Sequence, residues 1–345
     1  MMSEIKSNIL GAMLSFFLSI ALFRLVIYIM EPTNYARAVE ASLGVTTGHP
    51  VWRTFQSRVL GPYIIKMLSF ELSDYITAHV WFNIATIGIA AFLSWRMGRK
   101  YGGNDQSALL GLTIFGLSVA LLLSPPDLYS WDFIDIIVFL IFIDLVLSNA
   151  SPAWFLLLFI IAIWNRDSAN FIAVWLILDA LIRFLYARQQ KPNQLLPIPF
   201  DWWRLGLGLV CVGIGLILPE LLKQNLVIEE MAPKLYPNSL LIPFSASYNT
   251  AFLSNMQLLK ESLTHPNFQF WFIVPAFWVL IARLGLELVL RDAQRYLALY
   301  LVQLALLVAL QIFAVFNETR VYLILVPFVV IYAVLLSHSS SPSNS

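Results

Sequence analysis

The chain has 345 residues, of which 59% are hydrophobic and 12% are charged, with a mean hydropathy of +0.78. Soluble domains carry about 25% charged residues, so this composition excludes a soluble globular protein. The net charge of +1 gives no overall field for nucleic acid, and the single cysteine, Cys211, excludes an internal disulfide and a cysteine metal site. We therefore expect an all-α, polytopic transmembrane protein.

Ten apolar stretches follow one another along the chain, and most approach the roughly 20 residues that a helix needs to cross a bilayer. They lie near residues 8–30, 76–95, 107–124, 133–148, 152–164, 169–186, 204–222, 270–290, 296–316 and 320–337. They predict about ten membrane helices in one transmembrane domain, residues 1–337. A serine-rich, disordered tail would follow over residues 338–345.

Basic residues in the short loops predict the orientation of these helices. Such residues follow the second stretch, flank the loop after the sixth, and separate the eighth from the ninth: Arg96, Arg99, Lys100, Arg183, Arg188, Lys191, Arg204, Arg291 and Arg295. With ten helices, these loops and both termini share the cytoplasmic side. The long segments 31–75 and 223–269 then lie outside, and the apolar spacing within the first predicts interfacial helices.

The fifth and sixth stretches are separated only by the polar sequence Asn165-Arg166-Asp167-Ser168. Read as one long helix, they would move the following basic loop to the outer side, against the positive-inside rule. We therefore expect a hairpin whose polar turn dips below the outer surface of the membrane. Backbone without helix at that depth is tolerated where it lines a protein cavity.

The unusual polar residues of this threading gather on the outer side, where they predict a cleft open to the outer leaflet. They are Arg24, Glu31, Arg53, Arg58, Asp127, Asp132, Asp135, Arg166, Asp167, Glu220, Glu318 and Arg320. Arginine offers a rigid fork that matches phosphate oxygens, and a carboxylate can accept the proton of an acceptor hydroxyl. This combination favours transfer from a lipid phosphate.

Simpler interpretations stand beside this one. Arg166 with Asp167, and Glu318 with Arg320, are also explained as ion pairs that fix loops. Asp132 and Asp135 share a helix face and could bind a divalent ion such as Mg²⁺ or Mn²⁺, but we favour solvated acids at a helix start, since acids favour helix N-termini. We expect no other cofactor. Glu31 precedes Pro32, an ordinary arrangement at a helix end.

Three phrases occur together: Arg58-Val59-Leu60-Gly61-Pro62, Asn165-Arg166-Asp167-Ser168-Ala169, and Asn317-Glu318-Thr319-Arg320 followed by Tyr322-Leu323 and Pro327. This pattern resembles a group of bacterial polytopic proteins with an Arg-x-Leu-x-Pro segment, an Asn-Arg-Glu-Thr-like turn and a late Glu-x-Arg. Those proteins look like the GT-C superfamily of membrane glycosyltransferases. The resemblance implies an inner-membrane enzyme that takes sugar from a polyprenyl-phosphate-linked donor at the outer face.

The resemblance also implies roles for particular residues. The catalytic acid would be Glu31, with Glu40 second, while Asp167 and Glu318 would orient arginines or bind sugar hydroxyls. The substrate would be bound by Arg53, Arg58, Asp132, Asn165, Arg166, Asn317 and Arg320. The chain departs from the family pattern in two respects. It lacks an Asp-x-Asp motif in the first outer segment, and it has Asp167 where related sequences have glutamate.

Two other classes of function remain open from the sequence. A transporter or flippase for an anionic lipid or polyol would use the same arginines without chemistry. Such proteins often have repeated halves and broken helices at the membrane midplane, and the sequence has no internal repeat, so this class ranks second. A non-catalytic subunit of a larger membrane complex is the third possibility.

Overall fold

The computed structural model describes residues 2–72, 74–123, 128–190, 200–228, 242–245, 248–250, 252–264, 269–314 and 319–339. The α-helices are α1 Met2–Thr47, α2 Leu60–Glu71, α3 Tyr75–Gly102, α4 Asp105–Leu122, α5 Asp132–Leu147, α6 Pro152–Ile163, α7 Asn170–Gln190, α8 Trp202–Leu226, α9 Phe252–Thr264, α10 Val274–Arg291, α11 Ala293–Phe313 and α12 Val326–Ser339. Shorter helical turns are η1 Arg53–Ser57, η2 Asp167–Ala169, η3 Gln269–Ile273 and η4 Thr319–Leu325. A small antiparallel pair, β1 Ile242–Ser245 and β2 Tyr248–Thr250, completes the described elements.

The predicted helical class is confirmed, and every predicted apolar stretch coincides with a helix. Within the described residues, eight helices are long and apolar enough to cross a membrane, which is consistent with a polytopic membrane protein. The count of ten is not confirmed because α5 has 16 residues and α6 has 12. At 1.5 Å per residue, α6 spans only about 18 Å, short of the roughly 30 Å of a bilayer core.

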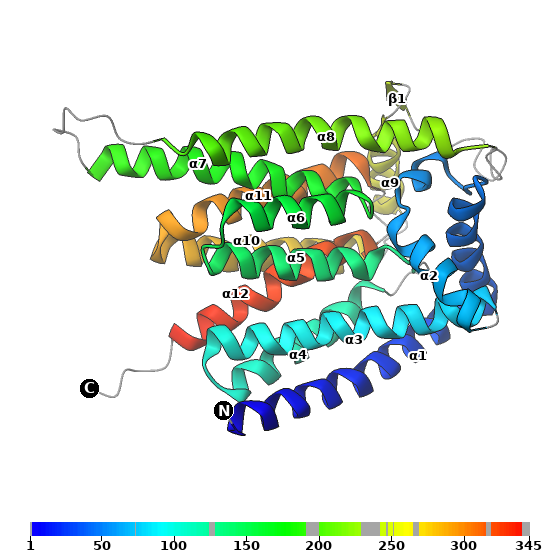
Figure 1. The fold of residues 1–345 in the computed structure, drawn as a ribbon, viewed down its shortest axis with the longest axis horizontal. Coiled ribbons are helices and arrows are strands. Elements are labelled where there is room, and N and C mark those ends of the chain that lie inside the picture. Colours follow the sequence, from blue (N-terminus) through cyan, green and yellow to red (C-terminus); the bar gives the residue numbers. More distant parts are fainter. Residues whose placement is uncertain are drawn as a thin grey trace.

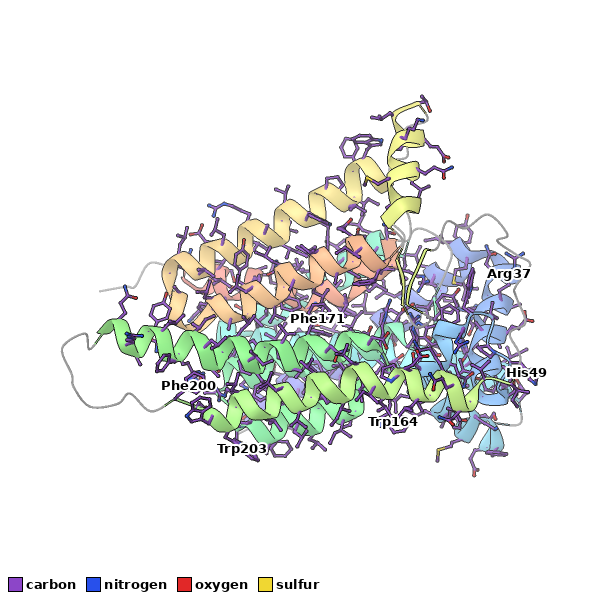
Figure 2. All side chains as sticks on the ribbon, turned by 90° about the horizontal axis from the view of Figure 1, so that it is seen from above. Arg37, His49, Trp164, Phe171, Phe200 and Trp203 are labelled. Carbon is purple, nitrogen blue, oxygen red and sulfur yellow. The ribbon has the colours of Figure 1, made fainter. Side chains whose placement is uncertain are left out.

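The first helix is longer than the sequence predicts. The apolar span ends at Met30, but α1 continues to Thr47, and its second half crosses the end of the bundle (Figure 1). Figure 2 shows this arrangement from above, with Arg37 and His49 at the end of the bundle that the second half of α1 crosses. The backbone of α1 therefore continues past Pro32, although proline lacks the N–H group that a helix interior uses. The described residues of segment 31–75 are mostly helical.

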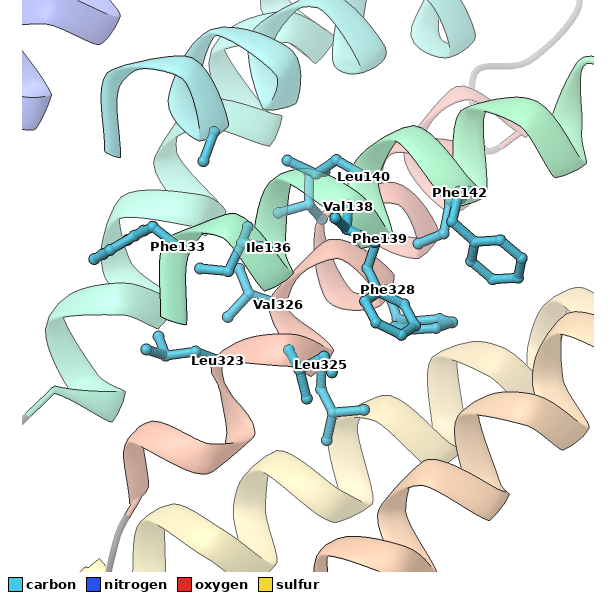
Figure 3. Packing of buried hydrophobic residues seen from close by; sticks show 14 of the residues in the cluster. Phe133, Ile136, Val138, Phe139, Leu140, Phe142, Leu323, Leu325, Val326 and Phe328 are labelled. Carbon is cyan, nitrogen blue, oxygen red and sulfur yellow. The ribbon is translucent and has the colours of Figure 1, made fainter. Parts of the chain in front are cut away.

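The core of the bundle is built around α12 and the turn that precedes it. α12 packs against α3, α4, α5 and α10, and its span is the most deeply buried of the eight. Phe328 of α12 lies 6.0 Å, between ring centroids, from Phe139 of α5 (Figure 3). α12 also continues to Ser339, two residues into the predicted tail.

Several helices begin with a side chain that caps the backbone. Asp74 accepts from the Thr77 N–H at the start of α3, and Asn104 accepts from the Ser107 N–H at the start of α4. Between these helices, Gly103 has φ 77°, a left-handed conformation that glycine adopts without steric cost. The α3–α4 turn is therefore fixed by local sequence.

The loops that carry basic residues meet at one end of the bundle. Lys100 lies 2.7 Å from Asp144, Arg295 donates to the Leu147 carbonyl, and Arg183 donates to Asn149. We call this the basic end. The start of α1 and the end of α12 lie at this end in Figure 1, while α2, α9 and the second half of α1 lie at the opposite end.

Candidate functional site

Charged residues from distant parts of the chain converge at the end opposite the basic end. Arg58 precedes α2, Arg166 lies in the α6–α7 turn, and Arg320 lies in η4. They surround Asp132 and Asp135 in the first turn of α5. We call Arg58, Asp132, Asp135, Asn165, Arg166 and Arg320 the arginine–aspartate cluster.

Asp132 connects two arginines from different segments. Its Oδ1 lies 3.7 Å from Arg166 Nη1, and its Oδ2 lies 3.4 Å from Arg320 Nη1. The same Oδ2 accepts from the backbone N–H of Tyr129 at 3.0 Å. The Asp132 side chain is 1% exposed, so its charge is balanced by these groups rather than by water.

Asp135 holds the polar turn between α6 and α7. Its Oδ2 lies 3.2 Å from Arg166 Nη1, and its Oδ1 accepts from Asn165 Nδ2 at 2.8 Å and from Ser168 Oγ at 3.3 Å. Asn165 Nδ2 also donates to the Trp131 carbonyl. The two donors of the Asn165 amide are therefore used, while its Oδ1 is buried and has no partner among the described residues.

Three aromatic rings support the arginines. Tyr129 and Trp131 are stacked with centroids 4.8 Å apart, and Phe55 lies 4.8 Å from Trp131. The guanidinium carbon of Arg58 lies 5.0 Å from the ring centroids of both Phe55 and Trp131, and that of Arg320 lies 4.3 Å from Tyr129. Such cation–π contacts are worth roughly 0.5–2 kcal/mol, and they fix the positions of the two guanidinium groups.

Arg58 differs from the other two arginines in its partners. Among the residues that the structure describes, no carboxylate lies within ion-pair distance of its guanidinium, which contacts aromatic rings instead. Burial and the neighbouring positive charge of Arg166 lower the pKa of Arg58 to about 10. Arg58 therefore stays charged at neutral pH and supplies a positive charge that has no carboxylate at contact distance.

The backbone around Arg58 is fixed by close packing. The Leu60 N–H donates to the Trp164 carbonyl at 2.9 Å, which joins the start of α2 to the polar turn. A Cβ atom at Gly61 would lie 2.8 Å from the Ser130 carbonyl oxygen, closer than Cβ contacts normally come. Glycine at this position thus lets α2 approach the segment that carries Tyr129 and Trp131.

The structure brings together five of the residues predicted to bind substrate. They are Arg58, Asp132, Asn165, Arg166 and Arg320. Arg53 is not among them, because its exposed guanidinium lies 3.8 Å from Glu220 of α8. The predicted ion pair between Arg166 and the adjacent Asp167 is also replaced, since Arg166 contacts Asp132 and Asp135 instead.

Of the three predicted catalytic acids, only Asp167 has a described side chain. Asp167 is exposed beside the cluster, near enough to interact electrostatically with Arg58. Glu318, like Asn317, lies outside the described residues. The backbone of Glu31 belongs to α1, but its side chain also lies outside the described part of the structure. The role of Glu31 therefore stays a prediction.

Sequence reasoning missed part of this site. Asp135 was expected to be a solvated acid at a helix start, yet it is buried against Arg166. Phe55, Tyr129 and Trp131 were not expected to support arginines; a usable signal was that Tyr129 and Trp131 lie within three residues before Asp132. Among the described residues there is no group of three His, Cys, Asp or Glu side chains that could hold a metal ion.

Comparison with known protein families, characterised proteins and solved structures finds no match for this chain.

Proposed function

We propose that this protein is a membrane glycosyltransferase of the GT-C type that uses a polyprenyl-phosphate-linked sugar as donor. The convergence of Arg58, Arg166 and Arg320 at one end of the bundle carries the proposal. Guanidinium groups bind phosphate oxygens in a planar, two-point geometry. Three guanidinium groups that converge, two of them over aromatic rings, suit a lipid phosphate better than an isolated ion pair would.

Arg58 is the proposed first contact for the phosphate, because its charge has no carboxylate partner in the described structure. The helix that begins two residues later offers an apolar surface to the lipid tail. Met67 and Phe70 of α2 are 71% and 78% exposed, whereas Ile65 faces the core. A phosphate at Arg58 and a polyprenyl chain along α2 would use both features of this segment.

The proposed reaction is a displacement at the sugar carbon that carries the phosphate. The acceptor hydroxyl loses its proton to a carboxylate, and its oxygen forms the new bond to that carbon. The bond from the carbon to the phosphate oxygen breaks, and the lipid phosphate leaves with the electron pair. The arginines stabilise the negative charge that develops on the leaving phosphate.

Two acids are candidates for the proton acceptor in this reaction. Glu31 is the acid that the family resemblance favours. Asp167 is the predicted catalytic acid whose described position, exposed and near Arg58, suits the role. Because an amide keeps the size of the carboxylate and removes the base, Glu31→Gln and Asp167→Asn should identify the base. Substitution of the residue that acts as the base should lower turnover much more than it lowers donor binding.

The proposed orientation places the basic end in the cytoplasm. Lys100, Arg183 and Arg295 at that end follow the positive-inside rule. The cluster then faces the other side of the membrane, as a bacterial inner-membrane enzyme with extracytoplasmic lipid-linked donors requires.

The experiment is sugar transfer from a polyprenyl-phosphate donor in liposomes that contain the purified protein. Arg58→Gln should reduce kcat/KM by about 100-fold or more, the range typical for loss of one stabilising group at a developing charge. Arg53→Gln is the matched control, since Arg53 lies at the same end but outside the cluster, and it should stay near wild type. Equal activity of the two variants would refute the proposal.

The same liposomes test the transporter or flippase alternative. A lipid phosphate that crosses the membrane without any sugar transfer, and stops crossing in Arg58→Gln, would favour that alternative. Arg58 precedes α2, which lies at one end of the bundle in Figure 1, whereas transporter sites lie near the midplane, so we rank transport second. A protein that binds the lipid but neither transfers sugar nor moves lipid across the membrane would favour a non-catalytic subunit.

A further inference from the structure

Asp132 occupies an unusual place for an acid in a site proposed to bind an anion. It is buried, and its two oxygens face two different guanidinium groups, those of Arg166 and Arg320. A phosphate that bound these arginines would make the same kind of contact as the Asp132 carboxylate makes now. The protein thus carries a negative group of its own where the ligand's charge would act.

We infer that Asp132 is a resident counter-ion that limits the affinity of the site for phosphate. In the absence of ligand it pairs with Arg320 at 3.4 Å, and together with Asp135 it balances the charge of Arg166. When the ligand's phosphate arrives, the carboxylate competes with it for both guanidinium groups. This inference rests on the proposed phosphate site and assigns to Asp132 the control of affinity rather than contact with substrate.

The contacts of the neighbouring acid support this division of roles. Asp135 also pairs with Arg166, but its other oxygen is engaged by Asn165 and Ser168 of the same turn. It therefore fixes the α6–α7 turn. Asp132 instead connects the α6–α7 turn to η4, the turn before the central helix α12. Of the two acids, only Asp132 contacts a second arginine in the described structure.

A competing counter-ion would serve a transferase at the end of its cycle. The leaving lipid phosphate must be released before the next donor binds. Three arginines without compensation would hold a phosphate strongly, because charge-assisted contacts in a partly buried site are strong. A carboxylate that returns to Arg166 and Arg320 as the product leaves would lower the barrier to release.

The test is the affinity of the detergent-solubilised full chain for inorganic phosphate and for polyprenyl monophosphate, measured by calorimetry. Asp132→Asn keeps the side-chain size and removes the competing charge. It should bind both probes about tenfold more tightly than wild type, a change that corresponds to 1.4 kcal/mol. Asp132→Glu, which keeps the charge, should not tighten binding. Asp144→Asn, at the basic end, is the matched control and should bind as wild type does.

Asp132→Asn removes one partner of buried ion pairs and is expected to lose stability, so a second measurement uses its thermal melting. Added phosphate should raise the Tm of Asp132→Asn much more than that of wild type, because the anion replaces the missing carboxylate. Weaker or unchanged binding by Asp132→Asn, with no extra rescue by phosphate, would overturn the inference. Failure of wild type to bind either probe would instead refute the proposed phosphate site.

Discussion

Arg320 and Asp132 lie 188 positions apart in the chain, yet Nη1 of the arginine is 3.4 Å from Oδ2 of the aspartate. Arg320 lies in η4, the turn directly before the most buried helix, and Asp132 begins α5. Both side chains are less than 10% exposed. Their contact joins the last part of the chain to its middle, and it places a guanidinium group over the Tyr129 ring. The site therefore depends on the correct packing of α5 against η4.

Two substitutions of Arg58 should separate the contribution of its charge to phosphate binding from that of its planar shape. Arg58→Lys keeps a positive charge but loses the fork and much of the stacking on Phe55 and Trp131. We expect Arg58→Lys to restore only part of the phosphate affinity that Arg58→Gln loses. Calorimetric titration with polyprenyl monophosphate compares the affinities of wild type, Arg58→Lys and Arg58→Gln. Full affinity of the lysine variant would show that only the charge matters.

The pKa of Arg58 predicts how phosphate binding depends on pH. Burial and the Arg166 charge lower this pKa to about 10, and the guanidinium binds an anion only while it is protonated. Affinity should therefore be steady from pH 8 to about pH 9 and fall as the pH rises through about 10. The Arg58→Gln variant should lack this step. A wild-type affinity that stays constant to pH 11 would contradict the predicted titration.

Gly61 should not tolerate a methyl group, because its Cβ would lie 2.8 Å from the Ser130 carbonyl oxygen. Gly61→Ala is expected to destabilise the protein by about 1–3 kcal/mol through the forced shift of α2. Gly206→Ala is the matched control in α8, where nothing lies within 4 Å of a Cβ, and it should be neutral or slightly stabilising. Thermal melting in detergent compares the two, and equal Tm values would contradict the packing described here.

Asn165 should contribute to stability through its two hydrogen bonds to Asp135 and the Trp131 carbonyl. Asn165→Ala removes both bonds from a buried position and leaves Asp135 Oδ1 with Ser168 and the Trp131 carbonyl with the Asp135 N–H, at a cost of about 1–3 kcal/mol. Asn225→Ala removes an exposed hydrogen bond within α8 and serves as the control. The difference between their unfolding free energies, measured in denaturant, should be at least about 1 kcal/mol. No difference would mean that the polar turn is not held in this way.

The two ends of the bundle should face opposite sides of the membrane. Thr47 and Gln106 are exposed residues in these two regions, and Cys211 can be replaced by alanine so that single cysteines are tested. An impermeant thiol reagent added outside intact cells should modify Thr47→Cys but not Gln106→Cys. Modification of Gln106→Cys alone would reverse the proposed orientation, and modification of both would contradict the threading.

The helices could be predicted because apolar stretches of sufficient length have few alternatives in a membrane. Two predictions differ from what the structure shows. Pro32 was taken as the end of a helix, but α1 continues to Thr47, since a proline can be accommodated within a helix. The count of ten spans is not confirmed, because α5 has 16 residues and α6 has 12.

The site could be predicted only in part. The three arginines were identified because charge is costly within apolar sequence and marks functional positions. Their partners were not, since which acid pairs with Arg320 depends on how α5 packs against η4. The aromatic support was missed for a similar reason, because Phe55 and Trp131 come together only in the folded chain.

The most direct test of the account is an experimental structure of the protein in lipid nanodiscs with bound polyprenyl monophosphate. We predict that the phosphate lies within hydrogen-bond distance of Arg58 and of at least one of Arg166 and Arg320, with the polyprenyl chain along α2. A phosphate bound at the basic end or elsewhere, with Arg58 still resting on Phe55 and Trp131 alone, would contradict the account.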